Sequence, residues 1–150
     1  GAAKSLVECG CDDEIVAAAV LHDTIEDAEV TVDQLRSLFG ERVASLVRSA
    51  SEPDKSDSWE NRKRHTIEYL KKAPMDEVLV SAADKLDNIR AISADHARVG
   101  EDLWKRFNRP KESQKWYYTA LAEAFLTRTG EGPGDGMFRE FASLVTGVFG

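Results

Sequence analysis

The stretch Leu21-His22-Asp23-Thr24-Ile25-Glu26-Asp27 stands where a strongly apolar segment of the chain ends. Every residue from 15 to 21 is apolar, and such an unbroken run predicts a helix that is buried on most sides. The side chains that follow are costly near an apolar core, because an unpaired carboxylate there is destabilising or has its pKa raised. A divalent cation would remove this cost, since it binds imidazole and carboxylate groups and keeps neighbouring carboxylates ionised.

Helical spacing of apolar residues continues along most of the chain, and no alternating pattern typical of a strand competes with it. A capping box of Thr31 and Gln34 predicts the start of one helix, and Gly40 predicts its end. Further helices are predicted to begin near residues 43, 59, 74, 110 and 138. Polar residues 52–58 and glycine-rich residues 129–136 are predicted connectors. The sequence therefore predicts an all-α helical bundle, with residues 1–150 in a single domain.

The composition argues against several classes of function. With 150 residues, of which 42% are hydrophobic, the chain is long enough for one compact core. Its formal net charge of −7 argues against a nucleic-acid polymer as partner, because such binding needs a basic surface. No stretch approaches the roughly 20 apolar residues that span a membrane, and no signal segment opens the chain, so we expect a cytoplasmic protein. The opening Gly-Ala-Ala-Lys lacks Met and leads directly into a helical pattern, so we expect that one or more N-terminal helices are missing.

A second group of polar residues lies on the predicted helix that follows Pro74. Ser81, Asp84, Lys85 and Asn88 share one helical face, while the opposite face is apolar. Asp84 could coordinate a metal ion, and Lys85 and Asn88 could bind phosphate or sugar oxygens. Taken alone, this face could instead be a solvated surface with local ion pairs, just as Thr24 and Asp27 could form an ordinary capping box. Both groups together, each in the right helical context, favour a functional site.

The two motifs together resemble a known family. Ala-Ala-Val-Leu-His22-Asp23-Thr-Ile-Glu26-Asp27, followed far downstream by Ala-Asp84-Lys-Leu-Asp-Asn88-Ile-Arg, is similar to the HD domain of guanosine tetraphosphate hydrolases. These are the hydrolase halves of RelA/SpoT enzymes and the small stand-alone alarmone hydrolases. The resemblance runs from about residue 16 to residue 92 and fades beyond residue 100, where the chain looks closer to small HD phosphohydrolases.

The resemblance implies an all-helical HD-superfamily bundle that holds one Mn²⁺, or another divalent cation such as Mg²⁺, Co²⁺ or Zn²⁺. His22, Asp23 and Asp84 would be three of its four ligands. Glu26 and Asp27 match the acidic pair that positions or activates the attacking water. Lys85 and Asn88 match positions that border the nucleotide.

The fourth ligand of the family is a histidine on an earlier helix, ahead of the point where this sequence begins. The remaining histidines, His65 and His96, do not have the position expected for it. His65 lies in the basic segment Arg62-Lys63-Arg64-His65, and we expect it to be solvated. His96 is expected at the surface or at a helix end.

Two features leave alternatives open. The basic segment around Arg62 and Lys63 is either a charged outer face or a source of phosphate contacts that lean over the metal pocket. The aromatic residues 116–118 are expected to be mainly core by their spacing, although one ring could stack on a purine.

The leading function is hydrolysis of a nucleotide phosphate or pyrophosphate ester, including the 3′-pyrophosphate of an alarmone. The alternatives are a 5′-nucleotidase-like phosphomonoesterase and, if the first histidine ligand is truly absent, a non-catalytic module that binds a nucleotide. The expected partner is thus a small phosphorylated nucleotide, and a homo-oligomer is left open.

Overall fold

The structure, a computed structural model, describes residues 2–25, 31–50 and 56–150. These residues form helices and turns without any strand, so the predicted all-α class is confirmed. The N-terminal half contains α1 (Ala2–Glu8), α2 (Asp13–Ile25), α3 (Val32–Phe39), α4 (Glu41–Ala50) and α5 (Trp59–Leu70). The C-terminal half contains α6 (Met75–Val99), the 3-10 helix η1 (Gly100–Arg106), α7 (Lys111–Leu126) and α8 (Asp135–Phe149).

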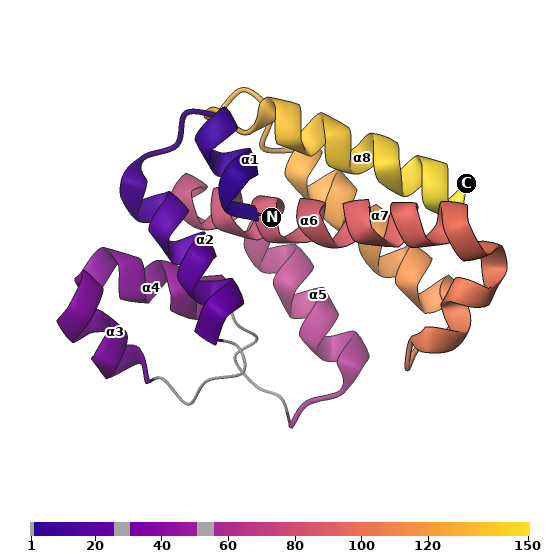
Figure 1. The fold of residues 1–150 in the computed structure, drawn as a ribbon, viewed down its shortest axis with the longest axis horizontal. Coiled ribbons are helices and arrows are strands. Elements are labelled where there is room, and N and C mark those ends of the chain that lie inside the picture. The colour runs from indigo at the N-terminus through magenta and orange to yellow at the C-terminus, as the bar shows by residue number, and fades with distance from the viewer. Residues whose placement is uncertain (1, 26–30, 51–55) are drawn as a thin grey trace.

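Helix α6 is the centre of the packing. Its 25 residues make it about 37 Å long, and it crosses the middle of the molecule in Figure 1. It contacts α1, α2 and α4 on one side and α8 on the other, while α5 packs against α7. The apolar stripe predicted for this helix is buried, and Ala83, Leu86 and Ile89 are fully enclosed. A helix packed on so many sides holds its polar residues in fixed places, and this positions the candidate site.

The second half of the core is aromatic and joins α7 to α8. The Phe125 ring stacks on Phe138 with centroids 5.6 Å apart and meets Phe141 edge-on at 5.4 Å. Aromatic pairs of this geometry stabilise the folded protein by more than the burial of their apolar area alone would. Tyr117 and Tyr118 are buried as their spacing predicts, whereas Trp116 is 38% exposed and does not belong to the core.

Several boundaries differ from those predicted. Helix α2 continues beyond the apolar run to Ile25, so His22 lies in its last turn. The predicted capping box is confirmed, since the hydroxyl of Thr31 accepts from the Gln34 amide at 3.1 Å and the Gln34 side chain accepts from the Thr31 amide at 2.8 Å. The 3-10 helix η1 was not predicted, because its seven residues carry no apolar stripe of helical period. In the part of the chain that the structure describes, no helix has the length and apolar character needed to cross a membrane.

Candidate metal and nucleotide site

The two motifs from the sequence meet where α2 packs against α6. His22 is only 8% exposed, and its Nδ1 atom faces Oδ1 of Asp84 at 3.9 Å. This distance is too long for a hydrogen bond. It is slightly shorter than the sum of two metal–ligand bonds of about 2.1 Å each, so the pair is spaced as two ligands of one ion would be. An imidazole nitrogen and a carboxylate oxygen also form a suitable donor set for a first-row divalent cation.

The other oxygen of Asp84 faces a cation. Oδ2 lies 3.5 Å from Nζ of Lys85, and both side chains are about one-fifth exposed. The Lys85 ammonium is also 6.0 Å from the ring centroid of Tyr117, within the range of a cation–π contact. Asp84 therefore lies between an imidazole and an ammonium group, and a phosphoryl group that approached this carboxylate would meet a positive charge beside it.

Of the other predicted residues of the first motif, the structure describes only the backbone of Asp23. Asp23 follows His22 in the last turn of α2, and its side chain lies outside the description. Glu26 and Asp27 both lie outside the described residues. Within the described ranges, no three His, Cys, Asp or Glu side chains come close enough to hold a metal ion together. The ligand role of Asp23 and the water-activating role of the acidic pair therefore stay predictions.

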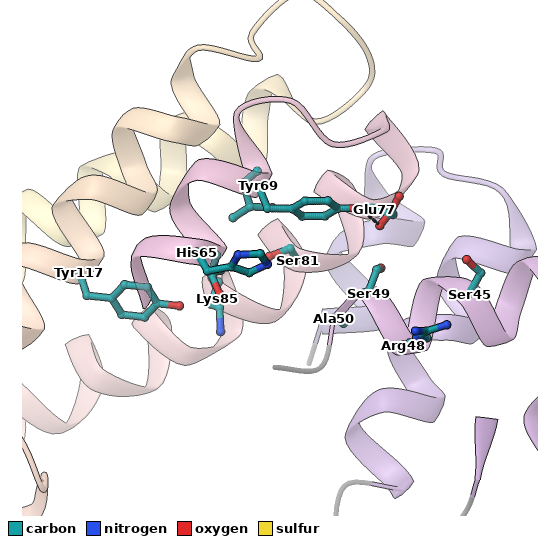
Figure 2. Close-up of a pocket in the computed structure, with 12 residues that line it drawn as sticks. Ser45, Arg48, Ser49, Ala50, His65, Tyr69, Glu77, Ser81, Lys85 and Tyr117 are labelled. Atoms are coloured by element: carbon teal, nitrogen blue, oxygen red, sulfur yellow. Dashed lines mark hydrogen bonds between the residues drawn. The ribbon is translucent and has the colours of Figure 1, made fainter. Parts of the chain in front are cut away.

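A cavity of about 470 Å³ opens beside Lys85, a volume within the range of small-molecule sites. Figure 2 shows that its walls come from four helices, α4, α5, α6 and α7. The lining residues are Ser45, Arg48, Ser49, Ala50, His65, Thr66, Tyr69, Leu70, Glu77, Ser81, Lys85 and Tyr117.

Of the four predicted substrate-binding residues, Lys85 is the one that lines this cavity. Asn88 is exposed, one turn further along α6, and does not line this cavity. Arg62 and Lys63 are half-buried on α5, and the Lys63 ammonium lies over the rings of Tyr117 and Trp59, at 5.0 and 5.8 Å from their centroids. The substrate contacts of these four residues stay predictions.

His65 is exposed, as its basic surroundings predict, yet it lines the cavity. Its ring stacks almost parallel to that of Tyr69, with an interplanar angle of 10° and centroids 6.4 Å apart. His96 is at the far end of α6, half-buried beside Trp104, with a ring-centroid distance of 6.0 Å. His96 does not line the cavity, which leaves His65 as the histidine nearer to the candidate site.

Sequence reasoning missed several polar residues of the cavity wall, among them Arg48, Tyr69 and Glu77. Arg48 stands on α4, opposite α5 in Figure 2. The hydroxyl of Tyr69 donates to the carboxylate of Glu77 at 2.6 Å, and this hydrogen bond, with partial burial, raises the pKa of Tyr69 to about 12. The spacing of Glu77, Ser81 and Lys85 at i, i+4 and i+8 was a usable signal, because Glu77 extends the predicted polar face of α6 by one turn.

Comparison with known proteins places these features in a family. Residues 1–111 match the HD domain family. The chain is 40% identical over 86 residues to guanosine-3′,5′-bis(diphosphate) 3′-pyrophosphohydrolase MESH1 of Drosophila melanogaster, covering 57% of this chain and 48% of that protein. It is 38% identical over 118 residues to human MESH1, covering 77% of this chain and 63% of that protein.

A bacterial relative is more distant. The guanosine-3′,5′-bis(diphosphate) 3′-pyrophosphohydrolase of Aquifex aeolicus is 34% identical over 94 residues, which cover 60% of this chain and 13% of that protein. This chain thus spans about half the length of the MESH1 proteins it matches, and a small part of the bacterial enzyme.

A solved structure supports the same fold over nearly the whole chain. The 1.85 Å crystal structure of lmo0812 from Listeria monocytogenes superposes with a TM-score of 0.88 at 37% identity, and the alignment covers 99% of this chain and 96% of that one. This agreement confirms the predicted HD-type helical fold. The family model covers more than half of the residues, and the chain belongs to the HD domain family.

Proposed function

We propose that this protein is a metal-dependent phosphohydrolase that acts on a nucleotide phosphate or pyrophosphate ester, with the 3′-pyrophosphate of guanosine tetraphosphate as the leading substrate. The observation that carries the proposal is the buried His22 facing Asp84 at 3.9 Å beside a cavity of about 470 Å³. The names of the relatives support the choice of substrate, since those proteins are guanosine-3′,5′-bis(diphosphate) 3′-pyrophosphohydrolases.

HD phosphohydrolases depend on a metal ion. The donor set of this chain fits such an ion, and we propose Mn²⁺, held by His22, Asp23 and Asp84. When bound, the ion would act as a Lewis acid toward the phosphoryl group. Mg²⁺, Co²⁺ and Zn²⁺ accept the same kinds of ligand and are the alternatives.

The chain's own residues bind the substrate and move the proton. Lys85 would hold a phosphate oxygen, and two observations support this role: its ammonium lies 3.5 Å from Asp84, and it lines the cavity. Arg62, Lys63 and Asn88 would bind further phosphate or sugar oxygens from outside this cavity. Glu26 or Asp27 would accept the proton of the attacking water as general base. The water oxygen then bonds to phosphorus, the bond from that phosphorus to the ribose oxygen breaks, and the ribose oxygen leaves and takes up a proton.

The wider setting follows from the same proposal. The partner is a small nucleotide rather than a nucleic-acid polymer, because the net charge of −7 disfavours binding to a polyanion. The cations around the cavity can still reverse the field locally. A cytoplasmic location suits such a substrate.

The proposal is tested by Mn²⁺-dependent release of pyrophosphate from guanosine tetraphosphate, measured beside release of phosphate from nucleoside monophosphates. Asp84→Asn should lower the rate of pyrophosphate release and weaken Mn²⁺ binding measured by calorimetry. Loss of a residue that only supports a metal ligand costs about 10- to 100-fold in affinity or activity, and loss of a ligand itself should cost at least as much. The matched control is Asp95→Asn on the same helix, since Asp95 pairs with Arg98 and Arg106 at the surface. This control should keep the wild-type rate of hydrolysis and the wild-type affinity for Mn²⁺.

Three results would contradict the proposal in different ways. Full activity of Asp84→Asn would remove Asp84 from the metal site. Phosphate release from monophosphates alone would contradict guanosine tetraphosphate as the leading substrate and would indicate the phosphomonoesterase. Tight nucleotide binding without turnover, with every divalent cation supplied, would indicate a binding module instead of an enzyme.

A further inference from the structure

The cavity between α4, α5, α6 and α7 adjoins the metal pair without including it. Neither His22 nor Asp84 lines it, and Asn88, one turn beyond Asp84 on α6, is outside it as well. Lys85 belongs to both places, because its ammonium lies 3.5 Å from Oδ2 of Asp84 and its side chain lines the cavity. A ligand in the cavity therefore meets one residue of the proposed hydrolytic site without touching the metal ligands.

Groups that bind anions reach the cavity from three of its walls. Arg48 extends from α4, His65 from α5 and Lys85 from α6, and Figure 2 shows all three among the lining residues. Arg48 and His65 are exposed, whereas Lys85 is only about one-fifth exposed, so these groups run from the mouth of the cavity to its inner part. Among the described residues, no carboxylate lies within ion-pair distance of Arg48, in contrast to Arg42 and Arg98.

The acidic lining residue, Glu77, lies two turns before Lys85 on α6, about 12 Å away along the helix axis. Its carboxylate accepts a hydrogen bond from the hydroxyl of Tyr69 at 2.6 Å. Ser81 lies between Glu77 and Lys85 on the same wall, so its hydroxyl can donate to a ligand near Lys85. An oxyanion at the Lys85 end of the cavity thus meets donors and is separated from the carboxylate of Glu77.

We propose that this cavity is a second anion site, which binds the inorganic phosphate or pyrophosphate that the hydrolysis releases. The source of the anion rests on the proposed hydrolase function, whereas the site itself depends only on the cavity wall. The Arg48 guanidinium presents several N–H donors to phosphate oxygens, and the Lys85 ammonium adds a second positive charge. A cavity of about 470 Å³ has room for either anion. Because Lys85 also contacts Asp84, an anion in the cavity draws its ammonium away from the metal pair and thereby inhibits hydrolysis.

Two other places for a bound phosphate predict different behaviour. If the anion is attracted only by the general field of the surface, loss of one positive charge should have a similar small effect wherever that charge lies. If the anion binds to the metal ion, its affinity should depend on Asp84 and not on Arg48. Binding to single variants therefore separates the cavity from both alternatives.

The test is a calorimetric titration of the Mn²⁺-loaded chain with inorganic phosphate. Arg48→Gln should weaken one binding event by about 10- to 150-fold, the effect of losing a hydrogen bond to a charged group. The same event should persist in Asp84→Asn, because Asp84 does not line the cavity. The matched control is Arg98→Gln, which removes the same charge from an exposed position on α6 outside the cavity and should bind phosphate as the wild type does.

Product inhibition gives a second measurement. At a constant concentration of unbound Mn²⁺, pyrophosphate should inhibit hydrolysis of guanosine tetraphosphate, and Arg48→Gln should raise the Ki by a similar factor. The kcat and KM of this variant without added pyrophosphate should stay at the wild-type values, since Arg48 is not part of the proposed hydrolytic site.

Several results would overturn the inference. It is wrong if the wild type binds no phosphate, if Arg48→Gln binds phosphate as tightly as the wild type, or if Asp84→Asn abolishes all phosphate binding. An unchanged Ki in Arg48→Gln would also contradict it. If the chain hydrolyses no nucleotide, the proposed function fails, and the titration with phosphate still decides whether the cavity binds anions.

Discussion

Arg128 joins the end of α7 to the turn between α5 and α6. It is only 9% exposed, and one guanidinium nitrogen donates to the backbone carbonyls of Leu70 at 3.0 Å and Ala73 at 2.8 Å. Its Nε and second terminal nitrogen donate to the carboxylate of Glu131 at 2.8 and 3.1 Å. The turn that Arg128 binds is the one that the Tyr69–Glu77 hydrogen bond also spans. We therefore expect the Arg128 side chain to be important both for stability and for the shape of the cavity.

Replacement of Arg128 by Met keeps most of the apolar stem and removes the guanidinium. A hydrogen bond to a charged group contributes about 1.5–3 kcal/mol, and a buried carbonyl left without a donor costs about 1–3 kcal/mol. Two carbonyls lose their donor, whereas the desolvation cost of burying the guanidinium is removed, so we expect a loss of about 2–4 kcal/mol. For a chain of this length each kcal/mol lowers Tm by about 2–4 °C, so the Tm of Arg128→Met should fall by about 5–15 °C.

Urea denaturation and thermal unfolding measure this loss directly. Glu131→Gln is the matched control, because it weakens only an ion pair whose carboxylate side is 48% exposed. Exposed pairs contribute about 0–1 kcal/mol, so this variant should remain close to wild type. The reasoning is wrong if Arg128→Met unfolds within about 0.5 kcal/mol of wild type. It is also wrong if Glu131→Gln loses as much stability, since the ion pair rather than the carbonyl contacts would then dominate.

Two further predictions concern other parts of the fold. A Cβ added at Gly134 would lie 2.8 Å from the buried ring of Phe138, so Gly134→Ala should cost about 1–3 kcal/mol in urea denaturation, whereas Gly136→Ala meets nothing within 4 Å and should be neutral or stabilising. The hydrogen bond from Arg42 lowers the pKa of the Asp12 carboxyl. A carboxyl group whose pKa is lower in the folded than in the unfolded protein stabilises the fold at pH values above its unfolded pKa. This stabilisation is lost as the pH falls through the pKa of the folded state. Arg42→Gln should therefore lower Tm at about pH 7 but not at about pH 2, and an equal difference at both pH values would contradict this assignment.

The local features of the fold were predictable from the sequence. Helical periodicity predicted the all-α class and the buried stripe of α6, and the side-chain pattern of Thr31 and Gln34 predicted a cap that the structure confirms. These features depend on residues within a few positions of one another. The position of Trp116 was not predictable in this way, because its exposure depends on how α5 and α7 pack.

In the candidate site, too, contacts between residues far apart in the sequence could not be predicted from local patterns. Sixty-two positions separate His22 from Asp84, so periodicity alone could not bring them together, and the resemblance to a family supplied that contact. The resemblance gave no indication of Arg48 or Glu77. Their importance comes from a cavity bounded by four helices, and such a cavity exists only after tertiary packing.

The two ends of the site depend on different parts of the structure. Asp84 lies in the middle of α6, where neighbouring helices and a complete set of backbone hydrogen bonds hold the chain. Glu77 lies in the first turn of the same helix, where its backbone amide donates to the Pro74 carbonyl and to the Asp76 carboxylate, and its side chain is held by a contact from outside the helix. The Tyr69 hydroxyl provides that contact, and Arg128 binds the turn that follows Tyr69. Loss of Arg128 should therefore change the shape of the cavity near Glu77 before it disturbs the His22–Asp84 pair, because the wall around Glu77 loosens while the packing of α2 on α6 persists.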